Sequence, residues 1–198
     1  MKSTLILSLL PFTALATPLV ARQDERAKFN GTIVSSGSGC PPGSVHPVFN
    51  PNNEYVQITL DSQIAQVGPG FGEADREKLC RISLFVTHRE GRSTVNARAT
   101  IGGDVTIPAA SRITGTLHRT YVVATGGEYR PADLTFTDRN VAFNQVDAFT
   151  VSPNVVGPAQ RVLEYVFEGS VRLQTSSQPS PSALLKQAIL NLDISQQS

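Results

Sequence analysis

The sequence predicts an all-β domain, an antiparallel β-sandwich of about eight strands. The composition favours it, because 198 residues include 15 Gly and 13 Pro but 1 Met and no Trp, as in turn-rich β proteins. Short runs with apolar side chains at alternate positions recur at intervals of about 8–15 residues. Turn formers rather than helical stretches of about 10–15 residues separate these runs, which argues against a parallel α/β sheet.

The predicted strands share β-branched and apolar side chains, most of them at alternate positions. In chain order they are 55–60, 80–86, 94–101, 105–107, 112–124, 134–137, 149–151 and 162–173. The first shows the period of two most clearly, with Val56, Ile58 and Leu60 on one face. In the second, the same period places Cys80 on the apolar face.

The segments between these strands carry turn signals. Residues 67–72 combine glycines with a proline and predict a loop, and the charged run 73–78 predicts a solvated loop or one helical turn. Gly102-Gly103 predicts a hairpin or a bulge. Residues 138–140 predict a turn.

The C-terminal part reads as a linker and a tail. Residues 175–182 (TSSQPSPS) have the composition of a linker. Beyond them, apolar residues follow three- and four-residue steps at Leu184, Leu185, Ala188, Ile189 and Leu192. This spacing slightly favours a short helix, and an edge strand through 189–194 is the alternative. We therefore predict a sandwich domain over 37–175 and a linker and tail over 176–198.

The N-terminal residues have the pattern of a secretory signal peptide. Lys2 supplies a positive charge, residues 5–16 are mostly apolar, and Ala14-Leu15-Ala16 gives the small-x-small cleavage pattern. The apolar stretch is shorter than the about 20 residues that cross a bilayer. We predict a signal peptide over 1–16, a flexible leader or pro-segment over 17–36, and a secreted, extracellular protein without a membrane span.

Two features fit an extracellular protein. Cys40 and Cys80 are the two cysteines, and an oxidising compartment predicts that they form a disulfide, the alternative being two buried thiols. Closing a loop of about 40 residues stabilises a fold by about 3–4 kcal/mol in the chain-entropy account. Asn30-Gly31-Thr32 is the one glycosylation sequon, so Asn30 is the candidate glycan site of a glycoprotein.

Charge and motifs exclude several classes of function. The 17 Lys and Arg nearly balance the 16 Asp and Glu, so we expect no nucleic-acid partner. His46, His88 and His118 are isolated from one another and from metal-ligand spacings, so we expect no metal site and no cofactor. No serine has the G-x-S-x-G frame of a hydrolase nucleophile, and the glycine-rich segments 36–39 and 68–72 lack a βαβ context.

Paired carboxylates are the remaining route to an enzyme, because glycoside hydrolysis uses two of them. Glu164 and Glu168 could share one strand face, Glu73 and Asp75 lie close together in a loop, and Asp147 is a further candidate. Carboxylates at alternate strand positions are, however, typical of the solvent-exposed face of a sheet. We therefore assign no catalytic residue.

Five segments resemble a family of small secreted fungal and bacterial proteins, the domain of unknown function 4360 (DUF4360). They are 39–45 (GCPPGSV), 55–60, 76–84, 115–121 and 156–158, within a similarity that spans 37–171. The resemblance implies secretion and a β-rich domain, with no established reaction or catalytic residues. Many members carry a second cysteine pair toward the C-terminus, whereas no cysteine follows Cys80 here.

These observations favour a non-enzymatic, effector-like or surface-binding protein whose partner is cell-wall polysaccharide or a host surface. Lack of Trp weakens sugar binding, because aromatic faces carry it, and Tyr55, Tyr121, Tyr129 and Tyr165 are the only hydroxylated substitutes. The alternatives are a secreted hydrolase of wall polysaccharide, with Glu164 or Asp147 as its carboxylate, and a structural matrix component.

Overall fold

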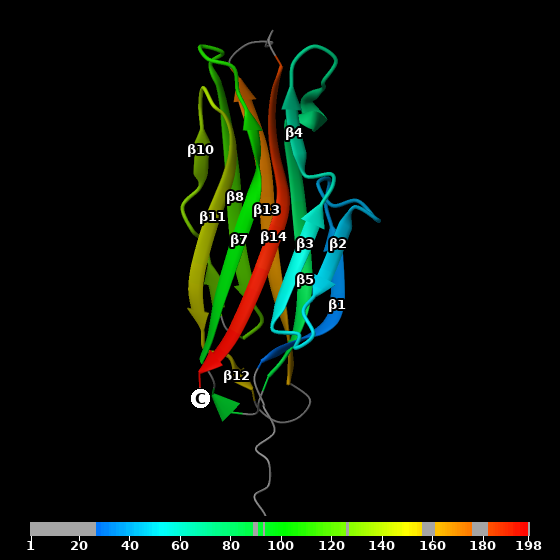
Figure 1. The fold of residues 1–198 in the computed structure, drawn as a ribbon, viewed down its shortest axis with the longest axis vertical. Coiled ribbons are helices and arrows are strands. Elements are labelled where there is room, and N and C mark those ends of the chain that lie inside the picture. The colour runs from blue at the N-terminus through cyan, green and yellow to red at the C-terminus, as the bar shows by residue number, and fades with distance from the viewer. Residues whose placement is uncertain are drawn as a thin grey trace, which may run out of the picture.

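Two antiparallel β-sheets pack face to face in the structure, which is a computed structural model (Figure 1). It describes residues 27–88, 91–92, 94–125, 127–155, 161–175 and 182–197. The predicted signal peptide and the first half of the predicted leader, residues 17–26, therefore lie outside the described residues. No helix within these ranges is long and apolar enough to cross a membrane. The predicted all-β sandwich is confirmed.

Sheet A lies behind sheet B in the view of Figure 1. Its strand order is β1 (Lys28–Ser36), β5 (Glu77–Thr87), β13 (Val162–Thr175), β8 (Ile113–Val123) and β10 (Leu134–Phe136), with β9 (Gly127–Tyr129) also paired to β8. Between the end of β4 and the start of β5 stands one 3₁₀ turn, η1 (Glu73–Asp75), as the charged run there predicted.

Sheet B faces the viewer in Figure 1. Its strand order is β11 (Asn140–Val151), β7 (Thr94–Thr106), β14 (Ala183–Gln197), β3 (Tyr55–Leu60) and β2 (Val45–Phe49), with β4 (Ile64–Val67) also paired to β14. A separate small ladder joins β12 (Asn154–Val155) to β6 (Gly91–Arg92).

The core fills the space between the sheets. Alternate residues of each strand point inward, so that Val56, Ile58 and Leu60 of β3 are buried, as predicted, while Gln57 and Thr59 are exposed. The opposite sheet supplies its own inward residues, of which the largest fully buried ones include Ile82, Leu84, Leu117, Phe167 and Leu173. Each sheet thus has an inner apolar face and an outer face open to solvent.

The predicted disulfide joins Cys40 to Cys80, with Cα atoms 5.1 Å apart. It fixes the glycine-rich segment before β2 against the start of β5. The Gly39 amide donates to the Leu79 carbonyl (2.8 Å), and Gly37 has a left-handed φ of 113°. A Cβ at Gly37 would lie 2.2 Å from the Leu79 oxygen, so this approach requires glycine.

The two sheets extend beyond both predicted limits of the sandwich domain. The leader was expected to run to residue 36, but residues 28–36 form β1, which pairs with β5 and buries Phe29. The tail was expected to hold a helix or an edge strand, but residues 183–197 form β14, which lies between β7 on one side and β3 and β4 on the other. The sandwich therefore includes segments on both sides of the predicted domain.

The helix-like spacing in β14 has a structural cause. A register shift between Gln187 and Ile189 changes which positions point inward, from Leu185 before it to Leu190 and Leu192 after it. Opposite the shift lies the Gly102-Gly103 pair, within one continuous strand, β7, rather than in a hairpin. A Cβ at Gly103 would meet the Lys186 carbonyl oxygen at 1.9 Å.

Candidate functional site

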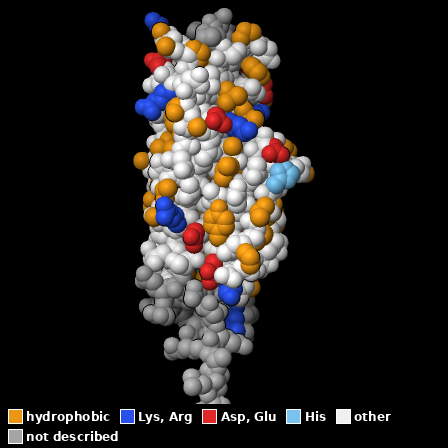
Figure 2. All heavy atoms as spheres, viewed as in Figure 1, with side chains coloured by type: hydrophobic (Ala, Val, Ile, Leu, Met, Phe, Trp, Pro, Cys, Tyr) orange, Lys and Arg blue, Asp and Glu red, His pale blue; other side chains and the backbone are white. Residues whose placement is uncertain are grey.

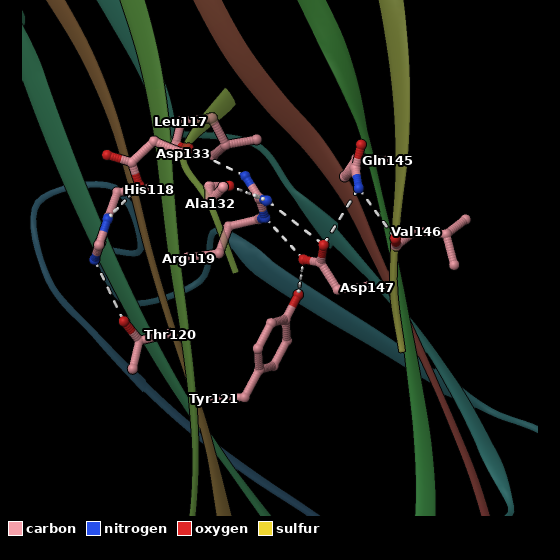
Figure 3. Close-up of polar contacts among 10 residues, drawn as sticks. All are labelled: Leu117, His118, Arg119, Thr120, Tyr121, Ala132, Asp133, Gln145, Val146 and Asp147. Atoms are coloured by element: carbon pink, nitrogen blue, oxygen red, sulfur yellow. Dashed lines mark hydrogen bonds and ion pairs between the residues drawn. The ribbon is translucent and has the colours of Figure 1, made fainter. Parts of the chain in front are cut away.

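A buried charged network links the two sheets (Figure 3). Arg119 of β8 is 1% exposed, and its Nε donates to Asp147 Oδ2 of β11 at 2.8 Å. Its Nη1 and Nη2 donate to the carbonyls of Leu117 (3.1 Å) and Ala132 (2.8 Å). The Tyr121 hydroxyl donates to the same Asp147 oxygen at 2.8 Å. The network therefore clamps β8 of sheet A to β11 of sheet B.

This clamp makes Asp147 a structural residue. Its carboxylate is buried and also lies 3.4 Å from the Gln145 amide nitrogen, so its oxygens are engaged by donors. Burial and the neighbouring Asp147 charge raise the pKa of Tyr121 far above its usual range, so Tyr121 stays a neutral donor. A hydrolytic role for Asp147 is not supported by this geometry.

Each histidine has its own partner in the structure. His46 Nε2 lies 2.8 Å from Asp61 Oδ2 on the surface. His88 is 3% exposed, and its Nε2 shares a hydrogen bond of 3.1 Å with the Tyr165 hydroxyl. Burial lowers the pKa of His88 to about 4, which keeps its ring neutral.

His118 lies in a short chain of polar contacts on the outer face of sheet A, visible in Figure 3. Its Nδ1 is 2.6 Å from Asp133 Oδ1, and its Nε2 is 3.3 Å from the Thr120 hydroxyl. The order hydroxyl, imidazole, carboxylate is that of a nucleophilic triad. Thr120, however, is only 3% exposed. The contacts therefore serve to pair polar groups on this face.

Three further candidate carboxylates, Glu168, Glu73 and Asp75, have partners of their own. Glu168 accepts from Arg81 at 2.8 Å, and Glu73 from Arg76 at 2.8 Å. The Gly72 amide and then Lys78 lower the pKa of Asp75, whereas a general acid needs a raised pKa. Within the described residues, no group of three or more His, Cys, Asp or Glu side chains could hold a metal ion.

The outer face of sheet B carries the arrangement best suited to a ligand. Strand register places Tyr55 opposite Asp193, and Asp193 opposite Arg98, in one row across β3, β14 and β7. The next row, two residues along each strand, contains Asn191 and Thr100. In Figure 2 this face is mostly uncharged, with scattered charged side chains.

Two adjoining hollows lie over these rows. One, of about 190 Å³, is lined by Tyr55, Arg98, Thr100, Asn191 and Asp193. The other, of about 380 Å³, shares Arg98 and Asp193 and extends toward β11. We call the two together the sheet-B hollow. From β3 to β11 they cross three strand spacings of about 4.8 Å, about 14 Å in all.

The polar groups of the sheet-B hollow have few internal partners. Within the part of the chain that the structure describes, neither the Arg98 guanidinium nor the Asp193 carboxylate forms a hydrogen bond or ion pair. Asn191 Oδ1 is buried without a partner in the same described part. Exposed, unpaired groups of opposite charge in one row are available to a ligand.

Sequence reasoning missed Arg98, Asn191 and Asp193. Alternation alone places Arg98 on the polar face of its strand, since Ala97 and Ala99 are buried. The missing step was the pairing of β7 with β14, because the tail after residue 182 was expected to be a short helix or an edge strand. Of the tyrosines, Tyr55 lines the hollow, whereas Tyr121 and Tyr165 are buried.

Asn30 is exposed on β1, at the edge of sheet A. Its side-chain oxygen accepts from the Thr32 amide at 3.0 Å, and Gly31 between them has a φ of 83°. The sequon thus lies in an accessible turn within the strand. A glycan at Asn30 stays a prediction.

The chain is similar to several known proteins. An uncharacterized secreted protein of Arthroderma benhamiae is 27% identical over 59 residues, which are 30% of this chain and 24% of that relative. The match thus spans about a quarter of the relative's length. Two solved structures are also similar: TmCBM61 in complex with β-1,4-galactotriose (12% identity, 86% of this chain and 90% of that one, TM-score 0.32), and a CBM4 (11%, 83% and 86%, TM-score 0.28). At such TM-scores we infer no ligand from them.

The family match is broader. The sequence profile described as domain of unknown function (DUF4360) matches residues 31–197, which reach from within β1 to the end of β14. It thus includes both segments that the sequence-based domain limits left out of the sandwich. The chain belongs to the DUF4360 family.

Proposed function

We propose that this protein is an extracellular, non-enzymatic binding protein, and that the sheet-B hollow binds a neutral cell-wall polysaccharide. The observation that carries the proposal is the row of Tyr55, Asp193 and Arg98. There a guanidinium and a carboxylate stand side by side on an exposed sheet face, next to an aromatic ring, without partners in the described chain.

The chemistry of this row suits sugar hydroxyl groups, which both donate and accept hydrogen bonds. Arg98 only donates, Asp193 only accepts, and the Thr100 hydroxyl does both. Hydrogen bonds to charged groups contribute about 1.5–3 kcal/mol each, more than those between neutral groups. The Tyr55 ring supplies an apolar face with a polar tip, which fits one side of a sugar ring.

The shape of the hollow favours a chain over a single sugar. Its two parts adjoin at Arg98 and Asp193, and one part reaches to β3 while the other reaches to β11. A linear polysaccharide along this direction would meet polar groups from β3, β14, β7 and β11 in turn. The rigid sheet holds these groups in place before the ligand arrives, which lowers the entropy lost on binding.

A hydrolase is not favoured by the same observations. Neither part of the sheet-B hollow is lined by Glu164, Glu168 or Asp147. Glu168 is already paired with Arg81 on the opposite outer face, and Asp147 lies in the interior. The binding proposal therefore needs no catalytic pair.

The test is retention of the protein on insoluble chitin, β-glucan and host wall material. We expect the wild type to be retained on at least one of them, and Arg98→Gln to weaken retention about tenfold or more. Arg81→Gln is the matched control, because it makes the same change on the outer face of sheet A. Loss of retention by both variants alike, or no retention of the wild type on any material, would overturn the proposal.

A further inference from the structure

Another hollow lies at one end of sheet A, the upper end in Figure 1, where β13 ends and β8 begins. Its volume is about 460 Å³. The charged residues that line it are Arg76, Arg112, Arg172, Glu73 and Glu77. We call it the end hollow. It shares no lining residue with the sheet-B hollow.

The two carboxylates of the end hollow neutralise its three arginines only in part. Glu73 pairs with Arg76 at 2.8 Å. Glu77 lies 3.8 Å from Arg172 Nε, which is too long for a hydrogen bond, and both of these side chains are about half exposed. Arg112 has no ion pair or hydrogen bond from its guanidinium to any residue in the described ranges. Within the described ranges, the hollow thus offers an anion the unpaired Arg112 guanidinium and the Arg172 guanidinium, which Glu77 holds in a loose ion pair at 3.8 Å.

The backbone around Arg112 is held in a costly conformation. Arg112 has a φ of 55° and Ala110 a φ of 59°, in the left-handed region that favours glycine. Neighbouring contacts fix this loop, since the Ala110 amide donates to Asp138 Oδ1 at 3.1 Å and the Ile113 amide to Ser111 Oγ at 3.4 Å. A long cationic side chain at a position where glycine would be unstrained is a pointer to function.

We propose that the end hollow binds a carboxylate group of an acidic polysaccharide, with Arg112 and Arg172 as its donors. Guanidinium groups recognise the planar carboxylate through paired, parallel hydrogen bonds. Thr114 and Gln174 in the same lining supply neutral polar groups for the hydroxyls of the same sugar. The protein then has two separate sites, one for neutral and one for acidic chains.

Binding of polygalacturonate by the full chain, followed by calorimetry at low salt, tests this proposal. We expect Arg112→Gln to weaken binding about tenfold or more, and added salt to weaken it as well. Fully methyl-esterified polymer is the matched ligand, because it keeps the chain and removes the charge, and it should not bind at the end hollow. Monomeric galacturonate tests whether the end hollow binds any small carboxylate. Weaker binding of the monomer than of polygalacturonate supports a site for the polymer.

Arg112→Gly keeps the test independent of folding. Glycine relieves the left-handed φ, so this variant should melt at or above the wild-type temperature while losing polygalacturonate binding. Arg81→Gln, at an arginine that lines neither hollow, should leave polygalacturonate binding unchanged, and the sheet-B proposal is tested on different polymers, so failure here is separable from failure of that proposal. Equal binding of the esterified polymer, or unchanged binding by both Arg112 variants, would overturn the inference.

Discussion

Two arginine–aspartate combinations in this molecule have the same chemistry and different surroundings. Arg119 and Asp147 are buried between the sheets and are joined by a hydrogen bond of 2.8 Å. Arg98 and Asp193 stand opposite each other on neighbouring strands, exposed on the outer face of sheet B and without bonds in the described chain.

The comparison shows that the buried charges stabilise the fold, whereas the exposed charges are available to a ligand. A buried charge must be paired and hydrogen-bonded, because water no longer solvates it. An exposed pair contributes about 0–1 kcal/mol at most, so nothing in the fold requires Arg98 and Asp193 to bond. Replacing the buried pair and replacing the exposed pair should therefore have different effects on the free energy of unfolding.

Breaking the buried combination should have the largest effect. Asp147→Asn removes the negative charge and leaves the Arg119 guanidinium buried without compensation. We expect the free energy of unfolding to fall by about 3–5 kcal/mol, measured by urea denaturation. The double replacement of Arg119 and Asp147 by Met and Leu should recover part of that loss, because no charge is then left buried. A single variant as stable as the wild type would contradict the clamp.

Acid should have the next largest effect, through His88, a buried base whose ring shares a hydrogen bond with the Tyr165 hydroxyl. His88 titrates at about 4 in the folded state and at about 6.5 when unfolded. Between these values the unfolded chain binds a proton that the folded chain does not. The unfolding free energy should therefore fall by about 3 kcal/mol as pH drops from 6.5 to 4, and this contribution should not change further below pH 4.

Denaturation curves across that pH range for the wild type and His88→Gln check this expectation. The variant should lose most of the slope whatever its absolute stability. His46→Gln, at an exposed position, is the matched control for the change of histidine to glutamine. The same slope in wild type and His88→Gln would show that another group titrates.

Changing the exposed combination should have the smallest effect on stability. Asp193→Asn and Arg98→Gln should each alter the unfolding free energy by no more than about 0.5 kcal/mol. Urea denaturation beside Asp147→Asn gives the direct comparison of buried with exposed carboxylates. A loss above about 2 kcal/mol for either surface variant would mean that these side chains support the fold.

The sheet architecture was predictable because the alternation of β3, β5 and β13 reports which face is buried. The helix favoured for the tail was not correct, because the register shift at Gln187 gives the strand β14 the apolar spacing of a helix. The polar clamp was not predictable either. Arg119 and Asp147 are 28 positions apart and belong to different sheets, so only strand order brings them together.

The candidate site also depends on strand order and register, which the sequence alone does not reveal. In the sequence, Arg98 and Asp193 each look like an ordinary residue of a solvent-exposed sheet face. Only the register of β7 with β14 places them opposite each other. The disulfide was predictable because two cysteines in an oxidising compartment allow one intramolecular pairing. Local sequence patterns thus predict the strands and the disulfide, whereas the candidate sites depend on strand pairing between distant segments.

The position of β14 also has a consequence for biogenesis. This strand joins β7 to β3 and β4, so sheet B consists of two separate parts until residues 183–197 arrive. During translation, β3, β4 and β7 emerge first and wait with open edges that another nascent chain could occupy. Sheet B can therefore close only once this strand has been synthesised, and any factor that covers the open edges before then would favour folding over association between chains.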